Sequence, residues 1–196
     1  MMPNEVDGNQ ILHPFGPFDL VVSPYSRGGR RVDVKRSKSA ILSRIQEMQA
    51  EQSGLCGDLS RKNGLYVFAI KTPGRDGQIR PYYVGKTDKQ GLLAEAFGPH
   101  QQTAYNHAVC LAKGAPVMYF IAPGGNKTKL KKQLVIDWER ILIYLAYSAN
   151  IELCNTHHVP STVRIEGVRL LRHQGNHSRG QANRTAAFDL NKLFDL

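Results

Sequence analysis

The chain has 196 residues, and its 26 lysine and arginine residues outnumber its 16 acidic residues, giving a formal net charge of +10 and an isoelectric point near 9.7. This length supports one hydrophobic core. The basic excess predicts a polyanionic partner, with nucleic acid favoured over an anionic membrane surface. The alternative is that the charge serves only solubility. The three cysteines are far apart and lack a CxxC pair, so they support neither a disulfide framework nor a zinc site, and the longest apolar stretch, residues 141–149, is too short to span a bilayer.

The first 60 residues are expected to form a basic extension with one helix. The start of the chain shows no signal-peptide pattern, which predicts a cytoplasmic protein. Prolines in residues 1–26 favour extended chain with one short edge strand. Ser39 is expected to cap a helix that runs to about Glu51. A basic cluster before that helix suits a phosphate-contacting arm, and comprises Arg27, Arg30, Arg31, Lys35 and Arg36.

A β-hairpin is predicted over residues 64–86. Two runs rich in β-branched and aromatic residues, 64–70 and 79–86, flank a segment that contains Pro-Gly and Asp-Gly. Each run carries a tyrosine near a glycine, in Gly-Leu-Tyr66 and in Tyr83-Val-Gly-Lys86. A single tyrosine in a strand usually packs in the core or against a neighbouring strand. The paired arrangement favours a functional role.

The following segment is predicted to contain two short helices, a buried strand and a long helix. The helices cover residues 92–97 and 100–113, and the strand covers residues 117–121. Thr128 is expected to cap the long helix, which runs from residue 129 to about residue 149. Four lysines crowd the N-terminus of this helix: Lys127, Lys129, Lys131 and Lys132. Their positive charge forms a candidate anion site, and the alternative is a solvated lysine face.

One carboxylate and one amide stand out after the hairpin. Glu139 lies among apolar residues in the middle of the long helix. A carboxylate in such a place is costly unless it is ion-paired or bound to a metal. Asn155 ends the segment that follows this helix. From residue 157 a basic C-terminal extension is expected, with a strand over residues 163–171, a small helix over residues 186–196, and phosphate-contacting residues Arg172 and Arg179.

These features together resemble the GIY-YIG nuclease superfamily, whose two half-motifs lie on adjacent strands and are followed by a helical glutamate and an asparagine. The resemblance covers residues 64–155 and implies a core domain over residues 61–156. It implies one divalent metal, Mg²⁺ or Mn²⁺, held by Glu139 at the scissile phosphate. By position, Tyr66 would activate or orient water, Tyr83 would hold the phosphate or act as the alternative base, and Asn155 would support the site. The glycines would let the backbone approach a phosphate closely.

The chain departs from the family at the helix after Tyr83-Val-Gly. Family nucleases carry an arginine there that stabilises the pentacovalent phosphate, whereas residues 92–97 contain none. Lys86 and His100 are the two candidate substitutes, the first as a point cation and the second as a base or donor near neutral pH. The loss of one transition-state donor typically costs about a hundredfold to a thousandfold in rate.

The expected fold is a mixed α+β domain, with a small three-stranded antiparallel sheet flanked by helices between basic N- and C-terminal extensions. The expected function is metal-dependent hydrolysis of phosphodiester bonds, in DNA rather than RNA. The alternatives are a non-catalytic nucleic-acid-binding module and a protein-binding domain, for which no dedicated sequence feature is found.

Overall fold

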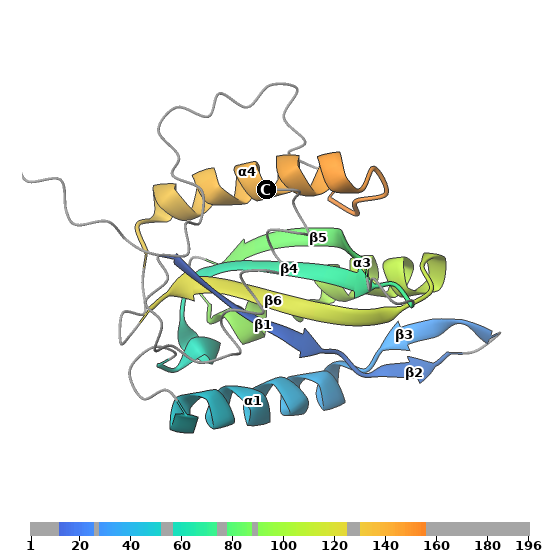
Figure 1. The fold of residues 1–196 in the computed structure, drawn as a ribbon, viewed down its shortest axis with the longest axis horizontal. Helices are drawn as coiled ribbons and strands as arrows, with labels where there is room; N and C mark the ends of the chain where they lie inside the picture. Colours follow the sequence, from blue (N-terminus) through green and yellow to red (C-terminus); the bar gives the residue numbers. More distant parts are fainter. Residues whose placement is uncertain are drawn as a thin grey trace, which may run out of the picture.

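The computed structural model describes residues 12–25, 28–51, 57–73, 78–87, 90–124 and 130–155. Figure 1 shows the helices and strands, which are, in chain order, β1 (Leu12–Asp19), β2 (Val22–Pro24), β3 (Arg30–Val32), α1 (Val34–Glu51), the 3₁₀ helix η2 (Leu59–Arg61), β4 (Gly64–Lys71), β5 (Ile79–Thr87), α2 (Leu92–Glu95), α3 (Pro99–Leu111), β6 (Ala115–Pro123) and α4 (Lys132–Ala149).

The main sheet is antiparallel and has the strand order β1-β6-β4-β5. β4 is its central strand and pairs with both β5 and β6, which explains why seven successive residues of β4, from Gly64 onward, are buried. The predicted hairpin is confirmed, because β4 and β5 pair in antiparallel fashion with Tyr66 opposite Gly85. β2 and β3 form a separate two-stranded sheet.

The prediction of a three-stranded sheet is wrong, although the mixed α+β class is confirmed. The fourth strand is β1, which pairs with β6. Pro14 and Pro17 weakened the strand signal in the sequence, but an edge strand tolerates proline because one side of its backbone has no partner strand. Leu12, Phe15 and Phe18 of β1 are buried, so the core retains the strand despite its prolines.

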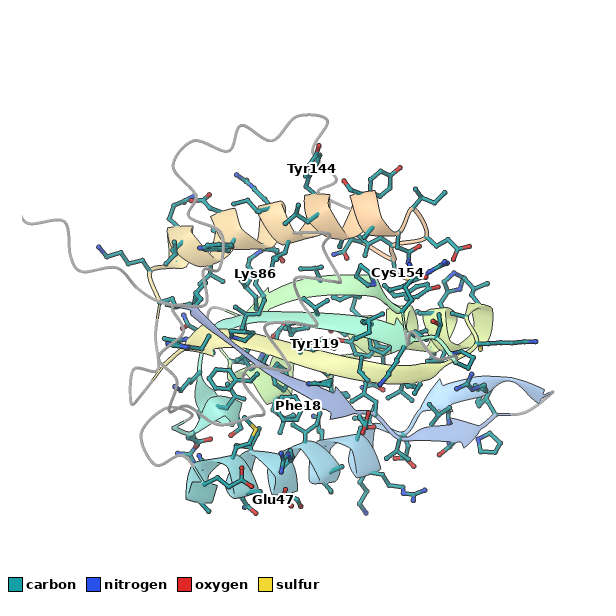
Figure 2. All side chains as sticks on the ribbon, viewed as in Figure 1. Phe18, Glu47, Lys86, Tyr119, Tyr144 and Cys154 are labelled. Atoms are coloured by element: carbon teal, nitrogen blue, oxygen red, sulfur yellow. The ribbon has the colours of Figure 1, made fainter. Side chains whose placement is uncertain are left out.

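Helices cover both faces of the main sheet (Figure 1). On one face, Phe68 and Phe120 of the sheet share a core with Ile45 of α1 and Tyr105 of α3. Figure 2 shows Phe18 between the sheet and α1. On the other face, the sheet packs against α4 through a second core, which includes Val67, Tyr119, Ile121, Leu142 and Ile143. The domain therefore has three layers, with the sheet in the middle.

Two predicted helix starts differ from the structure or lie outside it. α1 begins at Val34 rather than at Ser39, because the Asp33 carboxylate accepts a hydrogen bond from the Arg36 amide at 3.0 Å and so caps the helix earlier. Ser39 lies inside α1, where its hydroxyl donates to the Lys35 carbonyl. Thr128, the expected cap of α4, lies outside the described residues, as do the strand and helix predicted after residue 157.

Candidate active site

Four of the predicted site residues line one cavity of about 320 Å³ at the β5 edge of the main sheet. They come from three elements: Tyr66 from β4, Tyr83 and Lys86 from β5, and Glu139 from α4. The rest of the described lining comprises Gly85, Thr87, Gln90, Glu95 and Gln101. Side chains that lie 73 positions apart in sequence, from Tyr66 to Glu139, thus border one space.

A break in the β4–β5 register brings the two tyrosines to the same side of the sheet. Phe68 pairs with Tyr83 but Ala69 pairs with Pro81, so Tyr82 is an extra residue in β5. Tyr66 and Tyr83 consequently contact the same core cluster, and their rings stack with centroids 6.2 Å apart and planes 19° apart. The sequence could not settle this register, because the turn between the strands is long.

The glycines of the two half-motifs accommodate protein atoms in this structure. A Cβ atom added to Gly85 would overlap the ring and hydroxyl of Tyr66, and one added to Gly64 would overlap the carbonyl oxygen of Ile121. Gly85 therefore leaves the space through which the Tyr66 phenol reaches the cavity. This is a different physical reason from the close approach of backbone to phosphate that the motif led us to expect.

Lys86 and Glu139 form an ion pair across the cavity, between Lys86 Nζ and Glu139 Oε2. Lys86 lies two residues after Val84, which packs in the α4-facing core, so its side chain points to the same face. Figure 2 shows Lys86 between the sheet and α4. The two side chains are 30% and 13% exposed, respectively. The ammonium offsets the cost of placing the Glu139 carboxylate in a largely apolar helix.

The cavity lining includes four polar residues that the sequence analysis did not single out, and Gln101 and Glu95 are the two among them that interact with each other. Gln101, in the first turn of α3, donates from Nε2 to the Tyr66 hydroxyl at 3.1 Å and to Glu95 Oε1 at 3.4 Å. Gln101 is buried, whereas Glu95 of α2 is partly exposed. Gln101 belongs to a polar stretch without hydrophobic periodicity, so no sequence pattern marks it. Glu95 is the one acidic residue of the apolar run 92–97, and this isolated carboxylate is the kind of signal that could have found it. The described lining thus carries two carboxylates and one ammonium.

The surroundings of both tyrosines favour the protonated phenol. Burial is the largest cause that raises the pKa of Tyr66, followed by the neighbouring Tyr83. Burial also raises the pKa of Tyr83, followed by the negative charge of Glu139. A phenol that accepts a proton from water would need the opposite shift. Within the protein, both hydroxyls are therefore suited to donate hydrogen bonds, and a role as base requires additional positive charge.

Asn155 and His100 lie outside the cavity lining. The Asn155 side chain pairs with the backbone of β5, accepting from the Val84 amide at 2.9 Å and donating to the Val84 carbonyl at 2.7 Å. It therefore holds the strand that carries Tyr83 and Lys86. His100 is exposed in the first turn of α3 and does not contribute to the described lining.

The basic residues predicted to contact nucleic acid are distributed over several elements. Arg30 donates to the Gly114 carbonyl at 2.9 Å, and the Arg31 guanidinium lies 5.4 Å from the centre of the Tyr25 ring. Lys35 and Arg36 are exposed in the first turn of α1, and Lys131 and Lys132 are exposed at the start of α4. The others lie outside the described residues: Arg27, Lys127, Lys129, Arg172 and Arg179.

The described side chains restrict how a metal could be held. Among them, no three His, Cys, Asp or Glu residues are grouped as a metal cage. A divalent cation at Glu139 would therefore take its remaining ligands from water and substrate oxygens, which is ordinary behaviour for Mg²⁺. The net negative lining also suits a cation.

Among the described residues, every helix is too short or too polar to cross a bilayer.

Comparison with known proteins identifies no relative of this chain. No protein-family model matches it, and searches among curated proteins and solved structures find no match.

Proposed function

We propose that this protein is a metal-dependent endonuclease that hydrolyses phosphodiester bonds of DNA. The observation that carries the proposal is the convergence of Tyr66, Tyr83, Lys86 and Glu139 on one cavity. Two phenol donors, a carboxylate and an ammonium are the groups that positioning and charge stabilisation of a phosphodiester require. The net charge of +10 supports a polyanionic substrate.

Five residues in or beside the cavity have proposed roles that follow from their chemistry. Glu139 would hold Mg²⁺ or Mn²⁺, and the bound cation would stabilise negative charge on the scissile phosphate and the leaving oxygen. Tyr83 and Tyr66 would donate hydrogen bonds to phosphate oxygens or orient the attacking water, because their surroundings keep both phenols protonated. Gln101 holds the Tyr66 hydroxyl in place. Asn155 supports the geometry by bracing β5.

The test compares wild type with Glu139→Ala on supercoiled plasmid, linear duplex and RNA, with Mg²⁺, Mn²⁺ or EDTA. We expect wild type to cleave DNA with metal but not with EDTA, and Glu139→Ala to be slower by about a hundredfold or more. Asp137→Ala is the matched control, because Asp137 is an exposed carboxylate on the same helix and accepts from Gln133. Equal cleavage by wild type and Glu139→Ala would contradict the proposed role of Glu139.

A second candidate function is a nucleic-acid-binding module without catalysis. It is favoured by the ion pair of Lys86, whose charge is already matched by Glu139, and by Glu95, which α2 presents to the cavity where an arginine would serve phosphate chemistry. This candidate predicts no cleavage of any substrate, together with DNA binding that weakens steeply as salt concentration rises. If the protein does not bind DNA, or if its binding does not weaken as salt concentration rises, neither nucleic-acid function is supported.

A further inference from the structure

The ion pair between Lys86 and Glu139 occupies the carboxylate that the proposed function assigns to a metal. Glu139 Oε2 is engaged by the Lys86 ammonium, and the side chain of Glu139 is only 13% exposed. Two cations that approach the same partly buried carboxylate repel each other strongly, because solvent screening is reduced there. The ammonium and a divalent cation therefore cannot both be close partners of Glu139 without a large cost.

Lys86 has the freedom to leave this position. Its side chain is 30% exposed, more than that of its partner, and it consists of a flexible four-carbon stem with a compact charge at the end. The same stem starts from β5, whose backbone Asn155 braces at Val84. The ammonium can thus move while the strand stays in place, and the cavity beside it is large enough, at about 320 Å³, to receive it.

We propose that Lys86 is a built-in counter-ion of Glu139 that a divalent cation displaces, and that the released ammonium then serves the substrate phosphate. This inference rests on the proposed function in taking Glu139 as the cation ligand. In the metal-free protein the pair keeps the carboxylate neutralised. After displacement, the lysine supplies positive charge to the cavity, so metal binding and phosphate binding favour each other.

Metal binding is measured with Mn²⁺ alone on the full chain, by electron paramagnetic resonance of the free ion. Lys86→Met removes the ammonium but keeps most of the stem. We expect this variant to bind Mn²⁺ about tenfold more tightly than wild type, because the cation no longer has to break a partly buried, charged hydrogen bond to Glu139. Glu139→Gln should lose the site. Lys113→Met, which removes an exposed lysine of the loop after α3, is the charge-matched control and should bind as wild type does. Unchanged Mn²⁺ affinity in Lys86→Met would overturn the proposal.

Displacement is measured by acylation of lysine amines with an N-hydroxysuccinimide ester, followed by mass spectrometry. In wild type we expect Lys86 to react severalfold faster when Mn²⁺ is present than when it is absent. In Glu139→Gln without metal, Lys86 should react as fast as it does in wild type with Mn²⁺. The reactivity of Lys113 should be the same in every case. A purely long-range electrostatic effect would tighten Mn²⁺ binding without changing Lys86 reactivity, and that result would overturn the proposal. Neither readout needs a substrate, so failure to cleave DNA would contradict the proposed function without affecting this test.

Discussion

The absence of a side chain at Gly85 determines where the Tyr66 phenol lies. Gly85 is opposite Tyr66 in the β4–β5 ladder, and the ring and hydroxyl of Tyr66 occupy the space that a Cβ atom would need. Because Tyr66 is buried and its hydroxyl accepts from Gln101, the ring has little room to move aside. A single methyl group at this position would thus disturb the cavity and the core together.

We expect Gly85→Ala to lower the free energy of unfolding by about 1–3 kcal/mol, as for other overpacked core positions. The measurement is urea unfolding of wild type, Gly85→Ala, Tyr66→Leu and the double variant. If Tyr66 is the group that the methyl meets, the cost of Gly85→Ala should shrink in the Tyr66→Leu background. The same cost in both backgrounds would show that the strain arises elsewhere.

At the scale of elements, β5 depends on the segment that follows α4. β5 is an edge strand of the main sheet, and its outer backbone groups are met by the chain itself. The Cys154 amide donates to the Tyr82 carbonyl at 2.7 Å, and Asn155 makes its two bonds to Val84. The short segment after α4 therefore acts as a partial neighbour strand for the element that carries Tyr83 and Lys86.

Asn155→Ala removes both side-chain bonds to Val84 and should lower the free energy of unfolding by about 1–3 kcal/mol, at roughly 0.5–1.5 kcal/mol per hydrogen bond. Amide hydrogen exchange at Val84 should accelerate, because its N–H loses its acceptor. Asn155→Asp is the matched variant: it keeps an acceptor for the amide but cannot donate to the carbonyl, so an intermediate effect is expected. If the Val84 amide exchanges at the same rate in Asn155→Ala as in wild type, this bracing role is contradicted.

At the scale of the whole molecule, buried tyrosines link stability to alkaline pH. Burial is the largest cause that raises the pKa values of Tyr66, Tyr83 and Tyr105 in the folded protein, and the Tyr105 hydroxyl donates to the Ala96 carbonyl at 2.7 Å. The unfolded chain releases these phenol protons near pH ~10. The folded chain retains them to higher pH, so unfolding becomes coupled to proton release.

The stabilisation from these tyrosines should be complete below about pH 10 and should fall as the pH rises above it, because the unfolded state then binds fewer protons than the folded state. Each tyrosine contributes up to about 1.4 kcal/mol per pH unit in that range. The measurement is urea unfolding from pH 8 to 12, with tyrosinate absorbance followed in parallel. Ionisation of all eight tyrosines near pH 10 in the still folded protein would contradict the prediction.

The sequence predicted the elements whose signals are local. Turn residues and paired tyrosines identified the β4–β5 hairpin, and apolar spacing identified β6 and α4. β1 was underestimated because its prolines weaken the local signal, while its pairing with β6 depends on a contact about 100 positions away. In the site, a buried carboxylate pointed to Glu139, but its pairing with Lys86 depends on which face of β5 meets α4. Gln101 and Glu95 join the cavity only through the placement of α2 and α3.

The two edges of the main sheet also bear on how the molecule behaves at high concentration. An open strand edge is a template on which another chain can add a strand and start aggregation. At one edge, β1 contains Pro14 and Pro17, which lack the amide hydrogen that such pairing uses. At the other edge, Cys154 and Asn155 already engage the backbone of β5. The contacts that hold Tyr83 and Lys86 in position thus also oppose self-association, and a variant that loosens them would become more prone to form oligomers through β5.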